Sequence, residues 1–300
     1  MSDFSSMYER ALSAYLGLAL GDALGATLEF LSRAEIEARY GVHREITGGG
    51  WLALPRGAVT DDTEMSIALG DSILAHGGFS APKAAEAFAR WLRSRPRDCG
   101  NTCRRGIQRY LRDGSSSAAP NERHGGNGAL MRNLPVVLAT LGDPEACRAQ
   151  TLAQCHITHH HPYSDAAALA FGGMVAKMVC DEPFESVTEA AVALVRANPI
   201  FGYEDYTGRA GSYVAETVPT VLHHFFRTAD FESCVVGTVN SGDDADTTGA
   251  LAGMLAGARY GLSALPSRWL KRLDPDVRRR IERQTRGLLA LSTAFSPHLK

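Results

Sequence analysis

Two acidic clusters hold the residues in this sequence that are best suited to chemistry. The first is Thr60-Asp61-Asp62-Thr63-Glu64, and the second is Ser241-Gly242-Asp243-Asp244-Ala245-Asp246-Thr247. Each precedes an apolar stretch of helical character, so one aspartate in each could cap a helix and complement its dipole. A cap needs only one carboxylate, and each cluster holds at least two. Like charges this close together are unfavourable unless a cation balances them.

The residue types indicate which cation could balance these carboxylates. Neither cluster contains cysteine or histidine. Carboxylate and hydroxyl oxygens are hard ligands, which suit Mg²⁺ or Mn²⁺ better than zinc. The clusters lie 183 residues apart in the chain (244 minus 61), and we expect them to meet in space. Four carboxylates would then formally neutralise two divalent ions: Asp61, Asp62, Asp244 and Asp246. Asp243 is ambiguous, because three aspartates within four residues cannot all face one ion pair.

Helical periodicity dominates the segments that must position these clusters. Apolar residues recur at three- and four-residue spacing, while alternating β-branched runs are nearly absent. We therefore predict an all-α fold of helices joined by short loops, with residues 1–300 forming a single domain. The predicted helices cover residues 7–20, 62–75, 82–92, 128–140, 145–155, 164–179, 186–197, 212–226, 231–239, 247–260 and 275–291. A further basic helix, capped by Asn101 or Thr102, is predicted to end at Leu111, and the segment around residues 34–40 is amphipathic.

Two of these helices carry local predictions. Asp61 as N-cap with Glu64 three residues later fits a capping box at the start of helix 62–75. Pro135 lies inside helix 128–140 and should bend it.

The composition excludes several classes of protein. The apolar fraction is 45%, the charged fraction is 21%, and the net charge is −2, so we expect neither nucleic-acid binding nor direct insertion into a bilayer. No signal peptide precedes the first helix, and no apolar run is long enough to span a membrane. The six cysteines have no framework spacing, which indicates reduced thiols in a cytoplasmic protein.

A glycine-rich segment and a histidine run complete the candidate positions. Gly125-Gly126-Asn127-Gly128 is expected to open helix 128–140, where free N–H groups could bind a pyrophosphate and Arg132 could add charge. The run His159-His160-His161 does not predict a metal site. Three consecutive histidines cannot all face one ion on a regular element, and no acidic cluster adjoins them in the sequence.

Four motifs in order resemble the ADP-ribosylglycohydrolase family. They are Gly21-Asp22-Ala23-Leu24-Gly25, Thr60-Asp61-Asp62-Thr63, the segment from Gly126 to Arg132, and Gly242-Asp243-Asp244-Ala245-Asp246-Thr247. Three further segments look like the nitrogen-fixation branch of that family: Thr47–Trp51, Ser94–Arg105 and Asp246–Gly257. The resemblance covers roughly residues 8–260. It implies an all-α fold with a binuclear metal centre in a cleft.

The resemblance also implies an activity and a ligand set. The activity is hydrolysis of the N-glycosidic bond between ADP-ribose and an arginine side chain. The metals are expected to be two Mn²⁺ ions, with Mg²⁺ as a weaker substitute. The family motifs favour the register in which Asp244 and Asp246, not Asp243, are ligands. The implied ligands are Thr60, Asp61, Asp62, Asp244, Asp246 and Thr247.

Other residues are candidates for proton transfer and substrate binding. Cleavage of a glycosidic bond needs a proton for the leaving group. Glu29 and Asp98 are the candidate acid–base residues: the family places a carboxylate near position 29, and Asp98 lies in a loop that could reach the cleft. The sequence does not separate their roles. Predicted substrate-binding residues are Gly125, Gly126, Asn127, Gly128, His159 and Tyr213.

The implied partner is an ADP-ribosylated protein, namely the nitrogenase iron protein (dinitrogenase reductase), which hydrolysis would reactivate. The resemblance also suggests a PII signalling protein as regulator and reversible membrane association through a protein partner. We expect a monomer. The sequence leaves alternatives open: another ADP-ribose linkage, such as to serine or in a free metabolite, a non-catalytic ADP-ribose-binding relative, or a two-metal phosphohydrolase.

Overall fold

The computed structural model describes residues 2–295, and within this range it contains helices and turns but no strand, as the all-α prediction requires. Isolated β-bridges occur, for example between Gly126 and Tyr213. The helices are α1 (Ser2–Gly25), α2 (Arg33–Tyr40), α3 (Asp61–His76), α4 (Ala81–Arg93), α5 (Asn101–Asp113), α6 (Leu134–Ala139), α7 (Pro144–Cys155), α8 (Pro162–Val179), α9 (Phe184–Ala197), α10 (Val214–Arg227), α11 (Phe231–Val239), α12 (Ala245–Tyr260), α13 (Ser267–Leu270) and α14 (Pro275–Leu291). Short 3₁₀ turns cover Glu122–His124, Pro199–Phe201 and Leu262–Ala264.

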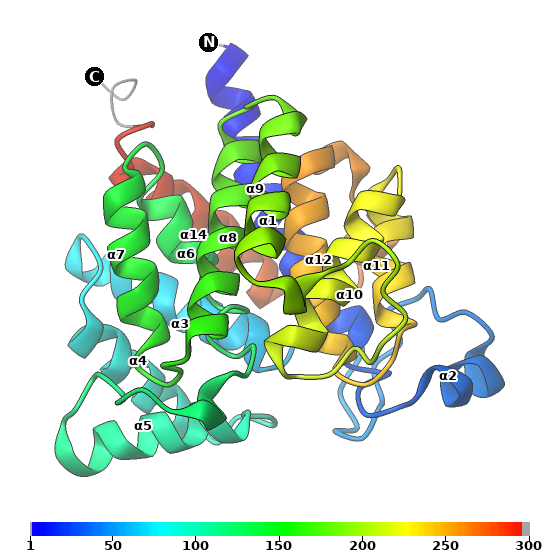
Figure 1. The fold of residues 1–300 in the computed structure, drawn as a ribbon, viewed down its shortest axis with the longest axis horizontal. Coiled ribbons are helices and arrows are strands. Elements are labelled where there is room, and N and C mark those ends of the chain that lie inside the picture. The colour runs from blue at the N-terminus through cyan, green and yellow to red at the C-terminus, as the bar shows by residue number, and fades with distance from the viewer. Residues whose placement is uncertain (1, 296–300) are drawn as a thin grey trace.

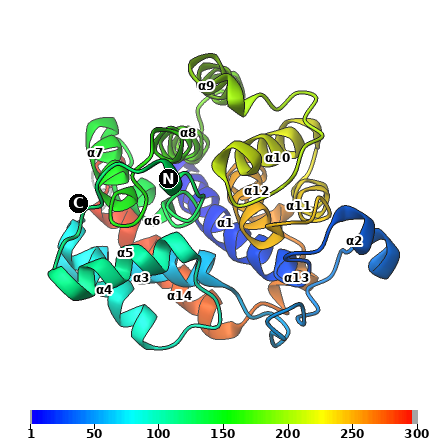
Figure 2. The same ribbon diagram turned by 60° about the horizontal axis from the view of Figure 1, so that its bottom comes forward.

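Helices α1 and α12 lie side by side at the centre of the fold (Figures 1 and 2). Their backbones touch because glycines line the interface. A Cβ atom on Gly17 would lie 2.2 Å from the carbonyl oxygen of Gly253, and one on Gly21 would lie 1.9 Å from that of Gly249. One turn further along, a Cβ atom on Gly25 would lie 2.0 Å from the carbonyl oxygen of Ala245. This close approach brings the end of α1 against the first turn of α12.

The remaining helices surround this central pair. Helix α14 packs on α1, α3 and α6, while α8 contacts both α1 and α12. Among residues 2–295, no helix combines the length and apolar character needed to cross a bilayer.

The predicted capping box at the start of α3 is wrong. The N-cap is Thr60, whose backbone is extended and whose side chain makes no capping hydrogen bond. The Glu64 carboxylate does not reach back to the cap; it accepts a hydrogen bond from the Trp91 indole N–H at 2.7 Å. The side chains of Thr60 and Glu64 therefore do not cap α3.

The predicted helix 128–140 is also wrong in its first half. Residues 128–132 form consecutive turns, and α6 begins only at Leu134. Pro135 lies in the first turn of α6 and therefore does not bend a longer helix. Backbone N–H groups in the first turn have no acceptor within the helix, so the N–H that proline lacks is not needed there. Gly125–Gly128 consequently does not open a helix.

Candidate active site

The two acidic clusters meet, as the sequence predicts, where α3 and α12 begin. The Thr60 hydroxyl lies 3.3 Å from Asp246 Oδ2, and the Thr247 hydroxyl lies 3.3 Å from Asp62 Oδ2. All four side chains are almost completely buried. The two segments therefore form one site, although 186 residues separate Thr60 from Asp246.

Asp22 of α1 holds the first cluster in place. Its carboxylate accepts hydrogen bonds from the Thr60 N–H at 2.9 Å, the Thr60 hydroxyl at 2.9 Å and the Thr63 hydroxyl at 2.6 Å. The side chain is fully buried. The sequence indicated this segment through its Gly-Asp-Ala-Leu-Gly motif, but it did not indicate that the aspartate supports the Thr-Asp-Asp-Thr segment.

A cleft of about 480 Å³ opens above the clusters. Glu29 and Asp98 both line it, together with Asp61, Asp244 and Asp246. The predicted acid–base candidates thus lie with the acidic clusters. The Cys99 N–H donates a hydrogen bond to Asp98 at 2.7 Å, and the Gly100 N–H donates to Asp61 at 2.9 Å, so one loop positions both carboxylates.

Asp243 lies apart from this group. Its carboxylate forms an ion pair with Arg209 at 2.9 Å, and its backbone adopts a positive φ of 52°. Asp244, by contrast, lines the cleft and accepts a hydrogen bond from the Asn127 side-chain amide at 2.6 Å. The side chains of the two adjacent aspartates therefore have different surroundings.

Burial disfavours the ionised form of these carboxylates. It raises the pKa of Asp22 to about 7, that of Glu29 to about 8 and that of Asp244 to about 6. Neighbouring carboxylates add to the effect of burial on Glu29 and Asp244, and they do the same in the rest of the group. The pKa values of three further members are raised well above their usual range: Asp61, Asp62 and Asp246.

The donor set fits a divalent cation with hard ligands. Carboxylate oxygens of Glu29, Asp244 and Asp246 lie within 4.8 Å of one another. Within residues 2–295, the Asp62 Oδ1 atom is buried and accepts no hydrogen bond. The donors that reach the other carboxylates are neutral groups, such as the Asn127 amide, the Thr63 hydroxyl and the Trp51 indole N–H. Oxygen ligands of this kind suit Mg²⁺ or Mn²⁺.

These pKa shifts predict an unusual pH dependence of stability for the metal-free protein. The native state holds protons on carboxylates that the unfolded chain releases near pH 4, so stability falls as the pH rises from about 4 to about 8. In EDTA, the melting temperature should be lower at pH 8 than at pH 6. Saturating Mn²⁺ should raise the melting temperature most at pH 8, where the fewest protons compete with Mn²⁺ for the carboxylates. A melting temperature that is flat or rises from pH 6 to pH 8 in EDTA would contradict this reading.

The glycine-rich segment forms one wall of the cleft. Gly126, Asn127 and Gly128 line it, whereas Gly125 packs against the ring of Tyr213. The Asn127 N–H donates to the carbonyl oxygen of Ser212 at 3.0 Å. Because this N–H is occupied and no helix starts here, the proposed use of free N–H groups at a helix terminus is not supported.

His159 lies in the cleft wall and Tyr213 lies outside it. The His159 ring is buried, which lowers its pKa well below the usual value, and its Nδ1 lies 2.7 Å from the Thr158 hydroxyl. Arg132, which the sequence suggested as a substrate contact, is fully buried and donates to Thr158 and Gln154. Arg132 therefore positions the segment before His159 and does not face the cleft.

Three kinds of cleft residue were missed from the sequence. Two arginines, Arg97 and Arg104, line the cleft and give it a cationic wall. Phe30 and Trp51 are exposed at 66% and 54%, with ring centroids 5.2 Å apart. Ser212 lines the cleft beside the glycine-rich wall. Trp51 and both arginines lie in segments that the family resemblance marked, but no pattern of residue types assigned their side chains to the cleft.

Comparison with known proteins places this geometry in a family context. The family model described as ADP-ribosylglycohydrolase matches residues 4–296. The chain is 53% identical over 287 residues to the ADP-ribosyl-[dinitrogen reductase] glycohydrolase of Rhodospirillum rubrum, covering 96% of this chain and 98% of that protein. It is 30% identical to the ADP-ribosylarginine hydrolase Tri1 of Serratia proteamaculans (strain 568), covering 90% of this chain and 76% of that protein. A solved structure, an ADP-ribosylglycohydrolase-related protein complex, superposes with a TM-score of 0.85 at 33% identity and covers 96% of this chain and 99% of that one.

Proposed function

This chain belongs to the ADP-ribosylglycohydrolase family, and we propose that it cleaves the N-glycosidic bond between ADP-ribose and an arginine side chain of a protein. The observation that carries the proposal is the meeting of the two acidic clusters in a cleft that also holds Glu29 and Asp98. The arginine linkage is supported by the printed name of the Serratia relative. The name of the Rhodospirillum relative supports the nitrogenase iron protein as target.

The carboxylate cluster would hold two divalent ions, for which Mn²⁺ is our first choice and Mg²⁺ our second. The proposed ligands are Thr60, Asp61, Asp62, Asp244, Asp246 and Thr247. When bound, these ions would supply Lewis-acid stabilisation of substrate oxygens and of an attacking water.

The remaining cleft residues suit the two halves of an ADP-ribosyl-arginine substrate. Arg97 and Arg104 provide positive charge for the diphosphate. The exposed rings of Phe30 and Trp51 provide aromatic faces on which an arginine guanidinium can stack. Neutral His159 can orient a ribose hydroxyl without adding charge.

Hydrolysis replaces one bond at the anomeric carbon. The oxygen of water bonds to that carbon, the carbon–nitrogen bond breaks, and the leaving guanidine nitrogen takes up a proton. Glu29 is suited to hold or deliver a proton near neutral pH, because burial raises its pKa to about 8. Asp98 lines the same cleft, and the pKa of its carboxyl is also raised by burial. We assign proton transfer to this pair of carboxylates.

The function is tested by measuring ADP-ribose release from an ADP-ribosyl-arginine peptide, first in EDTA and then with Mn²⁺ restored. We expect no release in EDTA and release after Mn²⁺ is added. ADP-ribosyl-serine peptide serves as the comparison substrate. Release from the serine peptide alone would replace the arginine linkage, and release from neither peptide by folded, Mn²⁺-loaded protein would refute the proposed reaction.

Trp51→Phe tests the support of Glu29. The Trp51 indole N–H donates to Glu29 Oε2 at 2.5 Å, and phenylalanine keeps an aromatic ring but lacks this donor. Glu29 is mostly protonated near neutral pH, and an ordinary hydrogen bond contributes about 0.5–1.5 kcal/mol, so kcat/KM should fall by roughly 2- to 10-fold. Trp91→Phe is the matched control, because it removes the same kind of indole–carboxylate bond, to Glu64, outside the cleft. Equal losses of kcat/KM in both variants would show that the Trp51 contact has no special role.

A further inference from the structure

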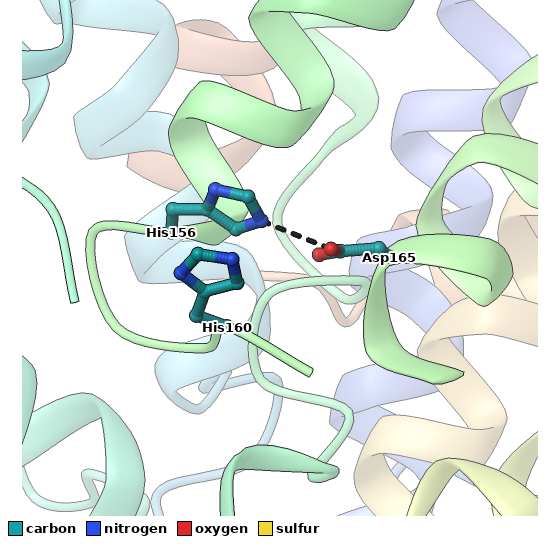
Figure 3. A group of neighbouring side chains, drawn as sticks. All are labelled: His156, His160 and Asp165. Carbon is teal, nitrogen blue, oxygen red and sulfur yellow. Dashed lines mark hydrogen bonds and ion pairs between the residues drawn. The ribbon is translucent and has the colours of Figure 1, made fainter. Parts of the chain in front are cut away.

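A second group of metal-binding side chains lies outside the acidic cleft. His156 is the C-cap of α7, His160 lies in the following loop, and Asp165 lies in the first turn of α8. One donor atom from each residue lies within 4.8 Å of the other two. His156 Nε2 is 2.9 Å from Asp165 Oδ2, and the two imidazole rings stack with centroids 3.6 Å apart. Figure 3 shows the Asp165 carboxylate pointing toward this pair of rings.

The surroundings of His160 fix which of its ring nitrogens can bind a metal. His160 Nδ1 lies 2.7 Å from the carbonyl oxygen of Ala118. A carbonyl oxygen only accepts hydrogen bonds, so Nδ1 carries the proton and Nε2 keeps a free lone pair. Metal-binding histidines are commonly oriented in this way, with the second ring N–H donated to a backbone carbonyl. In Figure 3 the ring nitrogen of His160 that is not next to its Cβ attachment lies on the side of Asp165.

Asp165 supplies an oxygen that lacks a partner. Within residues 2–295, its Oδ1 atom is buried and accepts no hydrogen bond, which is costly for a carboxylate. The side chains of His156 and Asp165 are 21% and 19% exposed, so solvent can reach the group. Two imidazoles and one carboxylate with an unused oxygen make a ligand set that a cation would complete.

We propose that His156, His160 and Asp165 bind one Zn²⁺ ion or a similar divalent transition-metal ion. Two imidazoles and one carboxylate form a known zinc ligand set, and water can fill the fourth position. Ligation would place the three donor atoms about 2.0–2.2 Å from the ion and would require the stacked rings of His156 and His160 to tilt apart. This ligand chemistry differs from that of the two acidic clusters, which offer only oxygen ligands.

The proposed site differs from a site made of the histidine run itself. Three consecutive histidines cannot all bind one ion, and the sequence therefore predicts no metal site within the run. The structure instead groups one member of the run, His160, with a histidine four residues earlier and an aspartate five residues later. Neither His159 nor His161 takes part.

A bound ion would fasten the loop that supplies His159 to the cleft. His159 precedes His160 and lines the cleft wall. The same loop is tied to the segment before the glycine-rich wall, because the Ala118 N–H donates to the His156 carbonyl at 2.6 Å and the Asn121 N–H donates to the His160 carbonyl at 3.0 Å. The ion would add a link from this loop to α8. Its role is to position the cleft wall, and the cluster itself does not face the substrate.

The experiment measures Zn²⁺ binding to the whole protein in excess Mn²⁺, by competition with a chromophoric zinc chelator. We expect His160→Gln and Asp165→Asn each to weaken the binding of one Zn²⁺ equivalent by at least about tenfold. Removing a residue that only hydrogen-bonds to a metal ligand already weakens metal binding by about tenfold or more, and removing a ligand itself should cost at least as much. His76→Gln is the matched control. Its Nδ1 also lies near a backbone carbonyl, that of Ser72 at 2.8 Å, but His76 does not belong to the group. Zn²⁺ affinity should be unchanged in this control.

A second measurement uses only the wild-type protein, so it does not depend on whether a variant folds. X-ray absorption is recorded at the zinc edge after the protein is loaded with one Zn²⁺ equivalent. We expect two imidazole ligands in the zinc shell. A shell of oxygen atoms alone would place the ion in the acidic cleft and overturn the proposal. Zn²⁺ affinity that is the same in the wild-type, His160→Gln and Asp165→Asn proteins would also overturn it.

Discussion

Asp244→Asn is expected to reduce ADP-ribose release by at least about 10³-fold and to weaken Mn²⁺ binding. Asparagine preserves the shape of the side chain but removes a negative charge from the centre of the acidic group. Metal ions contribute several kcal/mol of charge stabilisation to such reactions, and each 1.36 kcal/mol changes the rate tenfold. Turnover of the arginine-linked substrate and Mn²⁺ titration of the same preparation measure the two effects.

Asp243→Asn provides the control for Asp244→Asn. It makes the same chemical change one residue away, at a carboxylate that forms an ion pair with Arg209. Asparagine tolerates the positive φ of this position. We expect turnover to change by less than about fivefold, since an exposed ion pair contributes at most about 1 kcal/mol. Wild-type turnover in Asp244→Asn would remove Asp244 from the proposed ligand set, and equal losses in both variants would point to a general effect on folding.

Gly21→Ala is expected to lower the free energy of unfolding by about 3 kcal/mol or more, the upper end of typical overpacking effects. The added methyl group would lie 1.9 Å from the Gly249 carbonyl oxygen, so α1 and α12 must separate. Because Asp22 follows directly, the displacement should also weaken Mn²⁺ binding. Urea unfolding and Mn²⁺ titration measure these two outcomes.

Gly173→Ala is the matched substitution for Gly21→Ala. Gly173 also lies inside a helix, α8, but a Cβ atom there would meet nothing within 4 Å. Alanine favours a helix interior over glycine by about 1 kcal/mol, so this variant should be as stable as the wild type or more stable. If Gly21→Ala is equally well tolerated, the contact between the two helix backbones does not control stability.

The sequence was most informative where physical constraints are local. The helical spacing of apolar residues predicts most helices, since burial of one face requires that pattern. The excess of carboxylates in the Thr60–Glu64 and Ser241–Thr247 segments predicts that they meet, and the structure brings them together. The choice of Asp244 over Asp243 needed the family motif, because residue types alone did not distinguish them.

The sequence was least informative where long-range contacts decide the local structure. Turns replace the predicted helix over residues 128–132, where the Asn127 N–H bonds to Ser212 and Gly128 packs against the His159 ring. Glu64 matches a capping box in sequence, yet Trp91 of α4 takes its carboxylate. Arg97 and Arg104 reach the cleft only because of how the loop and α5 are placed. Such contacts leave no periodic pattern in the chain.

The pairing of α1 with α12 has a consequence for synthesis on the ribosome. Gly17 meets Gly253, which is added 236 residues later (253 minus 17). At about 5–20 residues per second, the apolar first helix waits roughly 10 to 50 seconds for its main partner. During that interval the glycine-lined face of α1 is not covered by α12, as it is in the native fold. A nascent chain that ends before residue 245 should therefore depend on chaperones to remain unaggregated, and final folding should follow release of the complete polypeptide.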